Sequence, residues 1–133
     1  MFNSSPTSNL IGVNRPCMIS TLREGAELKI GEGCGLSGTV IGCANRILLG
    51  RNVRCGANTL ITDTDWHGDD LRSGPDAPVI IEDDVWLGVN VTVLKGVTIG
   101  AGTLVGAGSV VTKSLPPRVI AAGVPTQVLR KIT

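Results

Sequence analysis

The sequence predicts an all-β fold, a parallel β-helix built of stacked triangular coils, and three observations indicate it. An apolar residue recurs at every sixth position through the second half of the chain. A small or polar residue follows three positions after each of these. Large aromatic residues are scarce, with one Phe, two Trp and no Tyr in 133 residues. A period of six suits neither an α-helix nor a plain sheet, but it is typical of the flat sides of a β-helix.

The repeat also predicts which side chains point into the coils. The repeat positions from residue 81 onward hold an apolar series: Ile81, Leu87, Val93, Ile99, Val105 and Val111. Two positions before each stands a second series of predicted inward residues: Val79, Val85, Val91, Val97, Thr103 and Ser109. The predicted corners, most of which tolerate a positive φ, are Asp84, Asn90, Gly96, Gly102, Gly108 and Ser114. Three such sides make one coil of about 18 residues.

The first half carries the same pattern less regularly. Its inward repeat positions are predicted to be Ile30, Leu36, Cys43, Leu49, Cys55 and Ile61. The phase slips by one residue between Leu36 and Cys43. Ile61 and Ile81 lie 20 positions apart, which breaks the period. We therefore expect the chain to leave the coil after Ile61, to form a loop and to rejoin near Val79. The whole chain then makes about four to five coils.

Composition and charge argue against several classes of function. A net charge of +1 without runs of Lys or Arg gives no support for nucleic-acid binding. Cys34, Cys43 and Cys55 fall at inward positions, where a thiol behaves as a small hydrophobe, and the repeat does not place Cys17. No Cys-x-x-Cys pair supports structural zinc. Reduced thiols indicate a cytoplasmic protein. We recognise no signal peptide, and no apolar stretch approaches the ~18 residues of a membrane span.

We expect residues 1–133 to form one domain. Residues 1–20 are expected to cap one open end of the β-helix, and residues 114–133 to form a C-terminal cap and tail. Pro116 and Pro117 should stop the ladder, because proline donates no hydrogen bond to it. For residues 127–132 the pattern leaves a short strand and a helical turn both open.

The loop at residues 62–78 contains the candidate active site. His67, the single histidine of the chain, lies there, with Asp63 and Asp65 just before it. Either carboxylate can accept a hydrogen bond from one ring nitrogen, which leaves the other nitrogen as a base. A surface histidine in a polar loop is the alternative. Asp63, Asp65 and Asp69 resemble the start of a calcium loop, but no glutamate follows at the required distance, so we expect no metal.

Trp86 is one of the two tryptophans and precedes the inward Leu87. The repeat predicts that Trp86 lies at a corner and points outward. An outward tryptophan often lines an interface or a ligand groove. Covering the neighbouring coil is the other interpretation.

The second half of the chain resembles the hexapeptide-repeat acyltransferases, and within them the maltose, galactoside and lipopolysaccharide O-acetyltransferases. The stretches that carry the resemblance are Asp84-Val85-Trp86-Leu87-Gly88, Gly96-Val97-Thr98-Ile99-Gly100, residues 106–113, Pro116-Pro117 and Ala122-Gly123-Val124-Pro125. The resemblance implies a left-handed parallel β-helix. It also implies a homotrimer with active sites between subunits, acetyl-CoA as cosubstrate and a role in lipopolysaccharide or polysaccharide modification.

The same resemblance assigns the site residues. It makes His67 the general base. It places acetyl-CoA in a groove near Gly88, Ala107, Thr112 and Lys113, where the outward Trp86 is a further expected contact. Arg130 matches a basic tail position that meets the phosphates of the cofactor. Many relatives carry a second basic residue where this chain has Gln127, and the N-terminal helical segment of the maltose and galactoside enzymes has no counterpart here.

The expected function is acetyl-CoA-dependent O-acetylation of a sugar or saccharide hydroxyl by direct transfer. His67 removes the hydroxyl proton, and a backbone N–H near Gly88 stabilises the oxyanion. One alternative is N-acetylation of an amino or nucleotide sugar, and another is a non-catalytic β-helical scaffold. A β-helical carbonic anhydrase needs three histidines around zinc, which one histidine per chain does not supply at an interface between two subunits.

Overall fold

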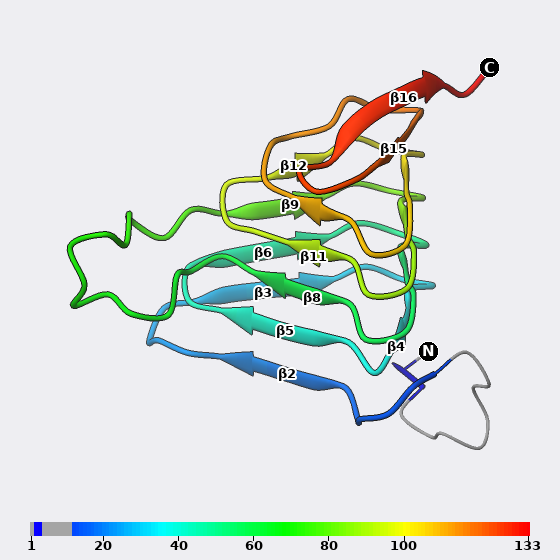
Figure 1. Cartoon of the computed structure of the whole chain (residues 1–133). Coiled ribbons are helices and arrows are strands. Elements are labelled where there is room, and N and C mark those ends of the chain that lie inside the picture. The colour runs from blue at the N-terminus through cyan, green and yellow to red at the C-terminus, as the bar shows by residue number, and fades with distance from the viewer. Residues whose placement is uncertain (1, 4–11) are drawn as a thin grey trace.

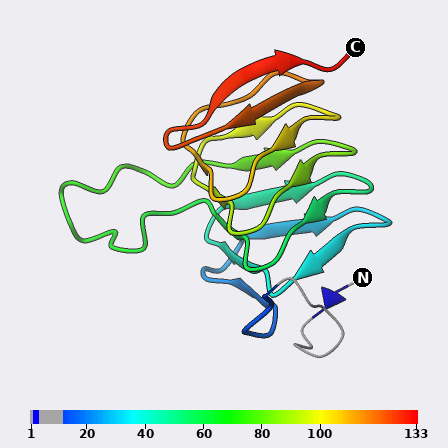
Figure 2. The same cartoon turned by 45° about the vertical axis from the view of Figure 1, so that its right-hand side comes forward.

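The computed structural model describes residues 2–3 and 12–133, which form a triangular prism of stacked coils (Figure 1, Figure 2). The described residues contain strands and turns but no helix, so none is long and apolar enough to cross a membrane. The first residues of the predicted N-terminal cap, residue 1 and residues 4–11, lie outside the described part.

Each side of the prism is one sheet. Sheet A contains, in spatial order, β1 (Phe2–Asn3), β4 (Gly35–Ser37), β7 (Arg54–Cys55), β10 (Trp86–Leu87), β13 (Leu104–Val105), β15 (Val119–Ala122) and β16 (Gln127–Lys131). Sheet B contains β2 (Met18–Thr21), β5 (Val40–Cys43), β8 (Leu60–Thr62), β11 (Thr92–Val93) and β14 (Val110–Val111). Sheet C contains β3 (Glu27–Ile30), β6 (Arg46–Leu49), β9 (Val79–Ile81) and β12 (Thr98–Ile99). The chain visits sheets B, C and A in turn, which produces the coils.

The register confirms the repeat in the second half. Leu87 pairs with Val105 and Val93 pairs with Val111, so one coil is 18 residues long. All twelve predicted inward residues from Val79 to Val111 are buried. The predicted corners have positive φ at Asp84, Asn90, Gly96, Gly102 and Gly108. Ser114 is not among the described residues with a positive φ.

The first half departs from the predicted phase at two corners. Ile41, not Cys43, is in register with Ile61, while Leu36 pairs with Cys55. The step from Leu36 to Ile41 is therefore one residue short, and the turn between β5 and β6 is longer. The predicted single slip is the net of these two changes. Cys43 is nevertheless buried, as predicted, because it takes a second inward position at the end of β5.

The ends of the chain add to sheet A and sheet B. β2 begins at Met18, inside the segment predicted as a cap, and pairs with β5. At the other end sheet C finishes with a bridge between Ile99 and Leu115, next to Pro116. The tail forms β16, which runs antiparallel to β15, so residues 127–131 are a strand. Sheet A therefore continues beyond the proline pair, where sheet C does not.

Candidate functional site

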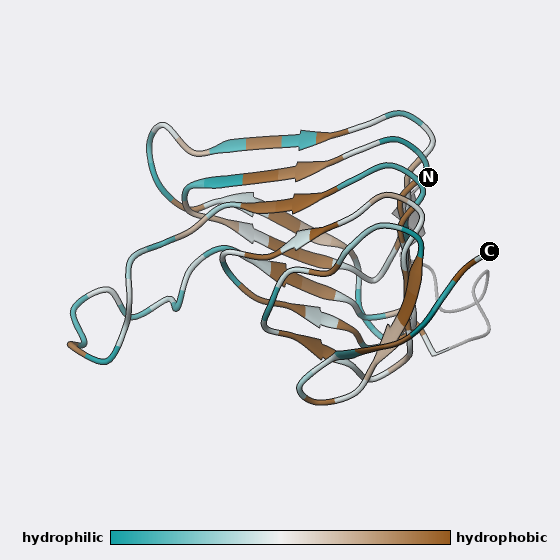
Figure 3. Cartoon of the chain, turned by 90° about the horizontal axis from the view of Figure 1, so that it is seen from above, coloured by the Kyte–Doolittle hydropathy of each residue, from teal (hydrophilic) through white to brown (hydrophobic). Residues whose placement is uncertain are grey.

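The candidate loop interrupts the third coil between β8 and β9, at the edge where sheet B meets sheet C. It projects from the prism (Figure 1, Figure 2), and its residues are mostly hydrophilic (Figure 3). The insertion does not disturb the strand register, because Leu49 pairs with Ile81 and Ile61 pairs with Val93 on either side of it. The predicted departure after Ile61 and return near Val79 are thus confirmed.

The base of the loop is fastened to the coils above and below it. Lys95, in the coil above, donates from Nζ to Asp65 Oδ2 at 2.6 Å and to the carbonyl of Pro75 at 3.1 Å. Arg23, two coils below in the turn between β2 and β3, forms an ion pair with Asp76. Lys95 therefore links the outgoing and returning segments of the loop, and Arg23 holds the returning segment. The position of Lys95 could have been predicted from the repeat, since the 18-residue period places this residue in the corner directly above the loop.

Asp63 stabilises the turn of the preceding coil. Its carboxylate is completely buried and accepts hydrogen bonds from the backbone N–H groups of Ala44, Asn45 and Arg46, each at 2.7 Å. Ala44 and Asn45 form the turn between β5 and β6, and Arg46 is the first residue of β6. A carboxylate is acceptor-only and suits three converging donors. The structure thus places Asp63 on this turn and away from the imidazole of His67.

The carboxylate of Asp65 also has hydrogen-bond partners other than His67. Besides Lys95, its carboxylate accepts a hydrogen bond from the N–H of Gly74 at 3.2 Å. The hydrogen bond from Lys95 is the main reason that the pKa of Asp65 lies below its usual value. The ion pair is partly exposed, with 42% of the Asp65 side chain accessible, so screening by solvent weakens it.

His67 is exposed, and its backbone is held in a turn. Its carbonyl accepts hydrogen bonds from Asp70 N at 3.0 Å and from Ser73 Oγ at 2.7 Å. Within the described part of the chain the imidazole itself forms no hydrogen bond, so it is paired with neither Asp63 nor Asp65, whose carboxylates have other partners. Both ring nitrogens are therefore available to a substrate or to a neighbouring subunit.

The predicted cofactor residues lie at two edges of the prism. Gly88 follows β10 at the edge between sheets A and B, where a Cβ on Gly88 would lie 2.8 Å from Ala107 N. Thr112 and Lys113 follow β14 at the edge between sheets B and C, above the loop. A side of about six residues, roughly 20 Å, separates the two edges. One chain thus brings Thr112 and Lys113 to the edge that carries His67, and leaves Gly88 and Ala107 at the other.

The backbone donors near Gly88 differ from the expectation. The N–H of Gly88 donates to the carbonyl of Val105 at 2.8 Å, so it belongs to the ladder. The exposed Ala107, by contrast, is not among the described residues whose N–H donates to the protein. A free backbone donor near Gly88 therefore exists, at Ala107.

Trp86 and Arg130 lie on sheet A. Trp86 occupies β10 and not a corner, which belongs to Asp84, but it points outward with 49% of its surface exposed. The guanidinium of Arg54 lies 5.8 Å from the centre of its ring, beside a pocket of about 390 Å³. Arg130 is exposed on β16 opposite Ile120.

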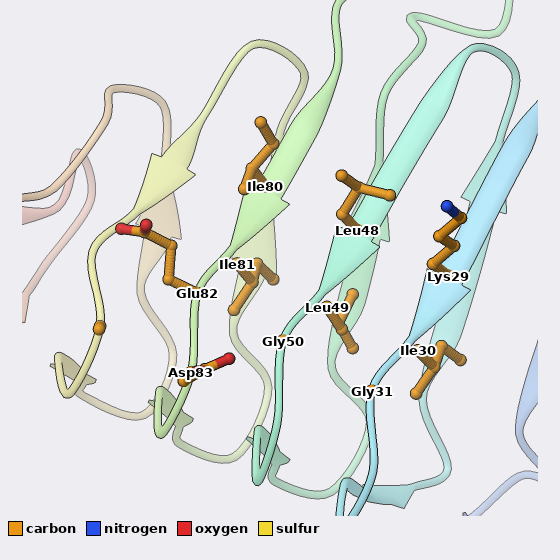
Figure 4. Close-up of a pocket in the computed structure, with 11 residues that line it drawn as sticks. Lys29, Ile30, Gly31, Leu48, Leu49, Gly50, Ile80, Ile81, Glu82 and Asp83 are labelled. Atoms are coloured by element: carbon orange, nitrogen blue, oxygen red, sulfur yellow. The ribbon is translucent and has the colours of Figure 1, made fainter.

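A larger pocket of about 720 Å³ lies on sheet C (Figure 4). Leu48 and Ile80 project from its strands, with Gly50 and Asp83 at its lower edge. None of the predicted site residues lines it. Among the described residues no group of three or more His, Cys, Asp or Glu side chains is placed to hold a metal ion.

The sequence pattern of one protein family matches the chain. It is described as bacterial transferase hexapeptide (six repeats) and covers residues 78–113. The galactoside O-acetyltransferase of Lactococcus lactis is 46% identical over 91 residues, which are 65% of this chain and 44% of that protein. The 2,3,4,5-tetrahydropyridine-2,6-dicarboxylate N-acetyltransferase of Brevibacillus brevis is 47% identical over 55 residues, which are 41% of this chain and 23% of that protein. The chain spans less than half the length of these curated relatives.

A solved structure gives the same fold. The hexapeptide-repeat acetyltransferase VCA0836 of Vibrio cholerae, complexed with acetyl coenzyme A, superposes with a TM-score of 0.76 at 30% identity. The match covers 89% of this chain and 66% of that protein. It confirms the predicted left-handed parallel β-helix. By its repeat, its fold and these relatives, the chain belongs to the hexapeptide-repeat acetyltransferase superfamily.

Proposed function

We propose that this protein transfers the acetyl group of acetyl-CoA to a hydroxyl of a sugar or saccharide, with His67 as general base. The observation that carries the proposal is the state of His67. It is the single histidine, its imidazole makes no hydrogen bond within the described residues, and it stands on a loop fastened at its base. A free imidazole on a fixed loop is suited to take a proton from a bound acceptor.

The reaction is a direct transfer. His67 accepts the proton of the acceptor hydroxyl, while the oxygen of that hydroxyl attacks the thioester carbonyl carbon. The tetrahedral intermediate collapses, the carbon–sulfur bond breaks, and the thiolate of CoA takes up the proton. The free N–H of Ala107 is a candidate donor to the cofactor or to the oxyanion.

The cysteines support direct transfer over an acyl-enzyme. Cys34, Cys43 and Cys55 are buried in the core, and burial raises the pKa of the Cys55 thiol to about 12. A thiolate is the reactive form of cysteine, so these residues are poor nucleophiles. None of the four cysteines forms a disulfide in the described part of the chain, which fits the cytoplasmic location that we propose.

We propose a homotrimer with sites between subunits. Within one chain, His67 and Lys113 lie at one edge of the prism, while Gly88 and Ala107 lie at another, roughly 20 Å away. A neighbouring copy that apposes its own Gly88 edge to the loop unites the two groups. Trp86 and Arg130, on sheet A, then join the cofactor groove from the neighbour's side.

The test is release of CoA from acetyl-CoA with paired hydroxyl and amine sugars, and the acetylated atom is identified by NMR. We expect transfer to oxygen, and a loss of about 10²–10⁴ in rate in His67→Ala with acetyl-CoA binding retained. Near-normal turnover in His67→Ala would remove the base from the mechanism. Transfer to amines alone would replace O-acetylation by N-acetylation, the activity named for the Brevibacillus relative. Failure to release CoA with either acceptor would favour a scaffold.

A further inference from the structure

We propose that Trp66 is the platform on which the sugar ring of the acceptor stacks, and that Gly42 is the seat that holds the indole in place. The inference deepens the proposed function and rests on it. It concerns acceptor binding, which can be measured apart from the role of His67.

The seat is visible in the space above Gly42. This residue is in β5 of sheet B, and a Cβ there would lie 2.5 Å from Cζ2 and 2.7 Å from Cη2 of Trp66. The indole edge therefore rests on the backbone itself. The backbone of Gly42 does not have a positive φ, so the site requires glycine for space and not for conformation. Any larger residue would push the ring away.

The backbone of Trp66 is strained to reach this seat. Its φ is 69°, in the left-handed region that bulky side chains rarely adopt. Its N–H donates to Thr64 Oγ1 at 3.2 Å, and Lys95 fixes the preceding Asp65. The loop thus holds this side chain in one orientation at an energetic cost.

The strain does not bury the ring. Trp66 remains 51% exposed. An aromatic side chain that served only as an anchor would be covered by the protein, because burial is the source of its stabilisation. A fixed, strained and half-exposed indole indicates that something else covers its free face.

The surroundings of Trp66 fit one sugar ring. Leu22 lies 3.7 Å from the same point above Gly42. Two apolar side chains, Trp66 and Leu22, are far fewer than the 20–30 residues on each side of a typical subunit interface. They match the apolar C–H face of a pyranose, whose hydroxyl rim needs polar partners. His67 follows Trp66 directly, and Arg23 and Asp69 lie in the same region, with Arg23 Nη2 3.7 Å from the Cβ position of Gly68.

The first test separates binding from chemistry. Trp66→Leu should raise the KM for a methyl pyranoside acceptor about tenfold, equal to about 1.4 kcal/mol, with little change in kcat or in the KM for acetyl-CoA. Trp66→Phe should recover most of the affinity. Gly42→Val should raise the acceptor KM in the same way, since it displaces the indole without changing any residue of the loop. The control is Leu71→Ala, which removes a fully exposed apolar residue from the same loop.

The second test needs no turnover. Trp86→Phe leaves Trp66 as the single tryptophan, because the chain has two. Addition of methyl galacto-, gluco- and manno-pyranosides should then shift or quench its fluorescence, and the added substitution His67→Ala should not remove the response. If the His67→Ala variant is active and its Trp66 fluorescence still responds to pyranosides, His67 is not the base, while the role of Trp66 in acceptor binding stands.

Three outcomes would overturn the platform. A fall in kcat without a change in acceptor KM in Trp66→Leu would make Trp66 a positioning residue for the loop. If the Trp66→Leu variant dissociates from the oligomer in sedimentation, Trp66 is a subunit contact. Fluorescence that no pyranoside changes, together with an unchanged acceptor KM, would show that the acceptor does not touch the indole.

Discussion

Lys95 Nζ lies 2.6 Å from Asp65 Oδ2 and bridges two coils at the point where the loop leaves the prism. We predict that Lys95→Met, which keeps the apolar stem, lowers kcat about tenfold, because a small displacement of a base is costly to the rate. The thermal midpoint should change little, since the pair is partly exposed. Lys29→Met, on sheet C with its own partner Glu27, is the matched control and should leave kcat unchanged. Equal rates in the two variants would contradict a role for the clamp.

The same pair predicts how pH acts on the loop. The pKa of Asp65 is lowered from 3.8 in the folded chain, mainly by Lys95. The contribution of the carboxylate is therefore complete above its unfolded pKa and is lost as pH falls through the lower folded value. Limited proteolysis of the loop should be insensitive to this group above about pH 5 and should accelerate only below pH 3.8. In Asp65→Asn, cleavage should be faster than in the parent chain above about pH 5, and the two rates should converge at low pH, where the carboxylate of the parent is protonated.

Asp63→Asn should destabilise the whole domain. The amide presents an N–H₂ group to backbone donors, so at least one of the three N–H groups at residues 44–46 loses its acceptor in a buried site. We expect a loss of about 2–4 kcal/mol in the free energy of unfolding in urea. Asp69→Asn, an exposed carboxylate in the same loop, serves as the control. A stability like that of the parent chain would show that water replaces the carboxylate.

Gly88→Ala should also be destabilising, through backbone crowding. The new Cβ would lie 2.8 Å from Ala107 N and 3.0 Å from Ala107 Cα, and neither atom can rotate away. A cost of about 1–3 kcal/mol follows from overpacking of this kind. Gly35→Ala is the comparison, since a Cβ there meets nothing within 4 Å. Thermal unfolding of the two variants side by side measures the difference.

Lys113→Ala and Arg130→Ala should raise the KM for acetyl-CoA with little change in kcat. Cations at a groove attract the phosphates of the cofactor, and both residues lie outside the core. The effect should diminish at high salt, because a Debye length of about 10 Å at 0.1 M screens exposed charges. Unchanged affinity of Arg130→Ala at low salt would return the β16 arginine to a surface role.

The sequence was sufficient for the coil because its physics is local and repetitive. Side chains such as Leu87 and Val105 alternate inward with a fixed period, and corners such as Asn90 need a residue that tolerates positive φ. Where two corners change length in opposite directions, between Leu36 and Leu49, counting alone reports only the net slip. The N–H groups of residues 44–46 there bind the carboxylate of Asp63, 17 to 19 positions away, a contact that no local pattern reveals.

The site was less predictable for the same reason. The break in the repeat located His67, but proximity in sequence suggested that Asp63 or Asp65 would contact its ring. In three dimensions the first carboxylate turns inward and the second turns to Lys95, which lies 30 positions away. The seat at Gly42 could not be found from sequence either, since a strand glycine has many uses and Trp66 lies 24 positions further along the chain.

The insertion between β8 and β9 has a consequence for how such enzymes diversify. The step from Leu49 to Ile81 is 32 residues where Ile81 to Ile99 is 18, yet both pairs stack in the same ladder. The stacking of the coils therefore does not depend on the length of the segment that joins β8 to β9. A segment of different length and composition, grafted between Asp63 and Asp76, would inherit the fastening to Arg23 and leave the prism as it is. New acceptor preferences can thus arise by exchange of one cassette, without the destabilisation that accompanies change inside a packed core.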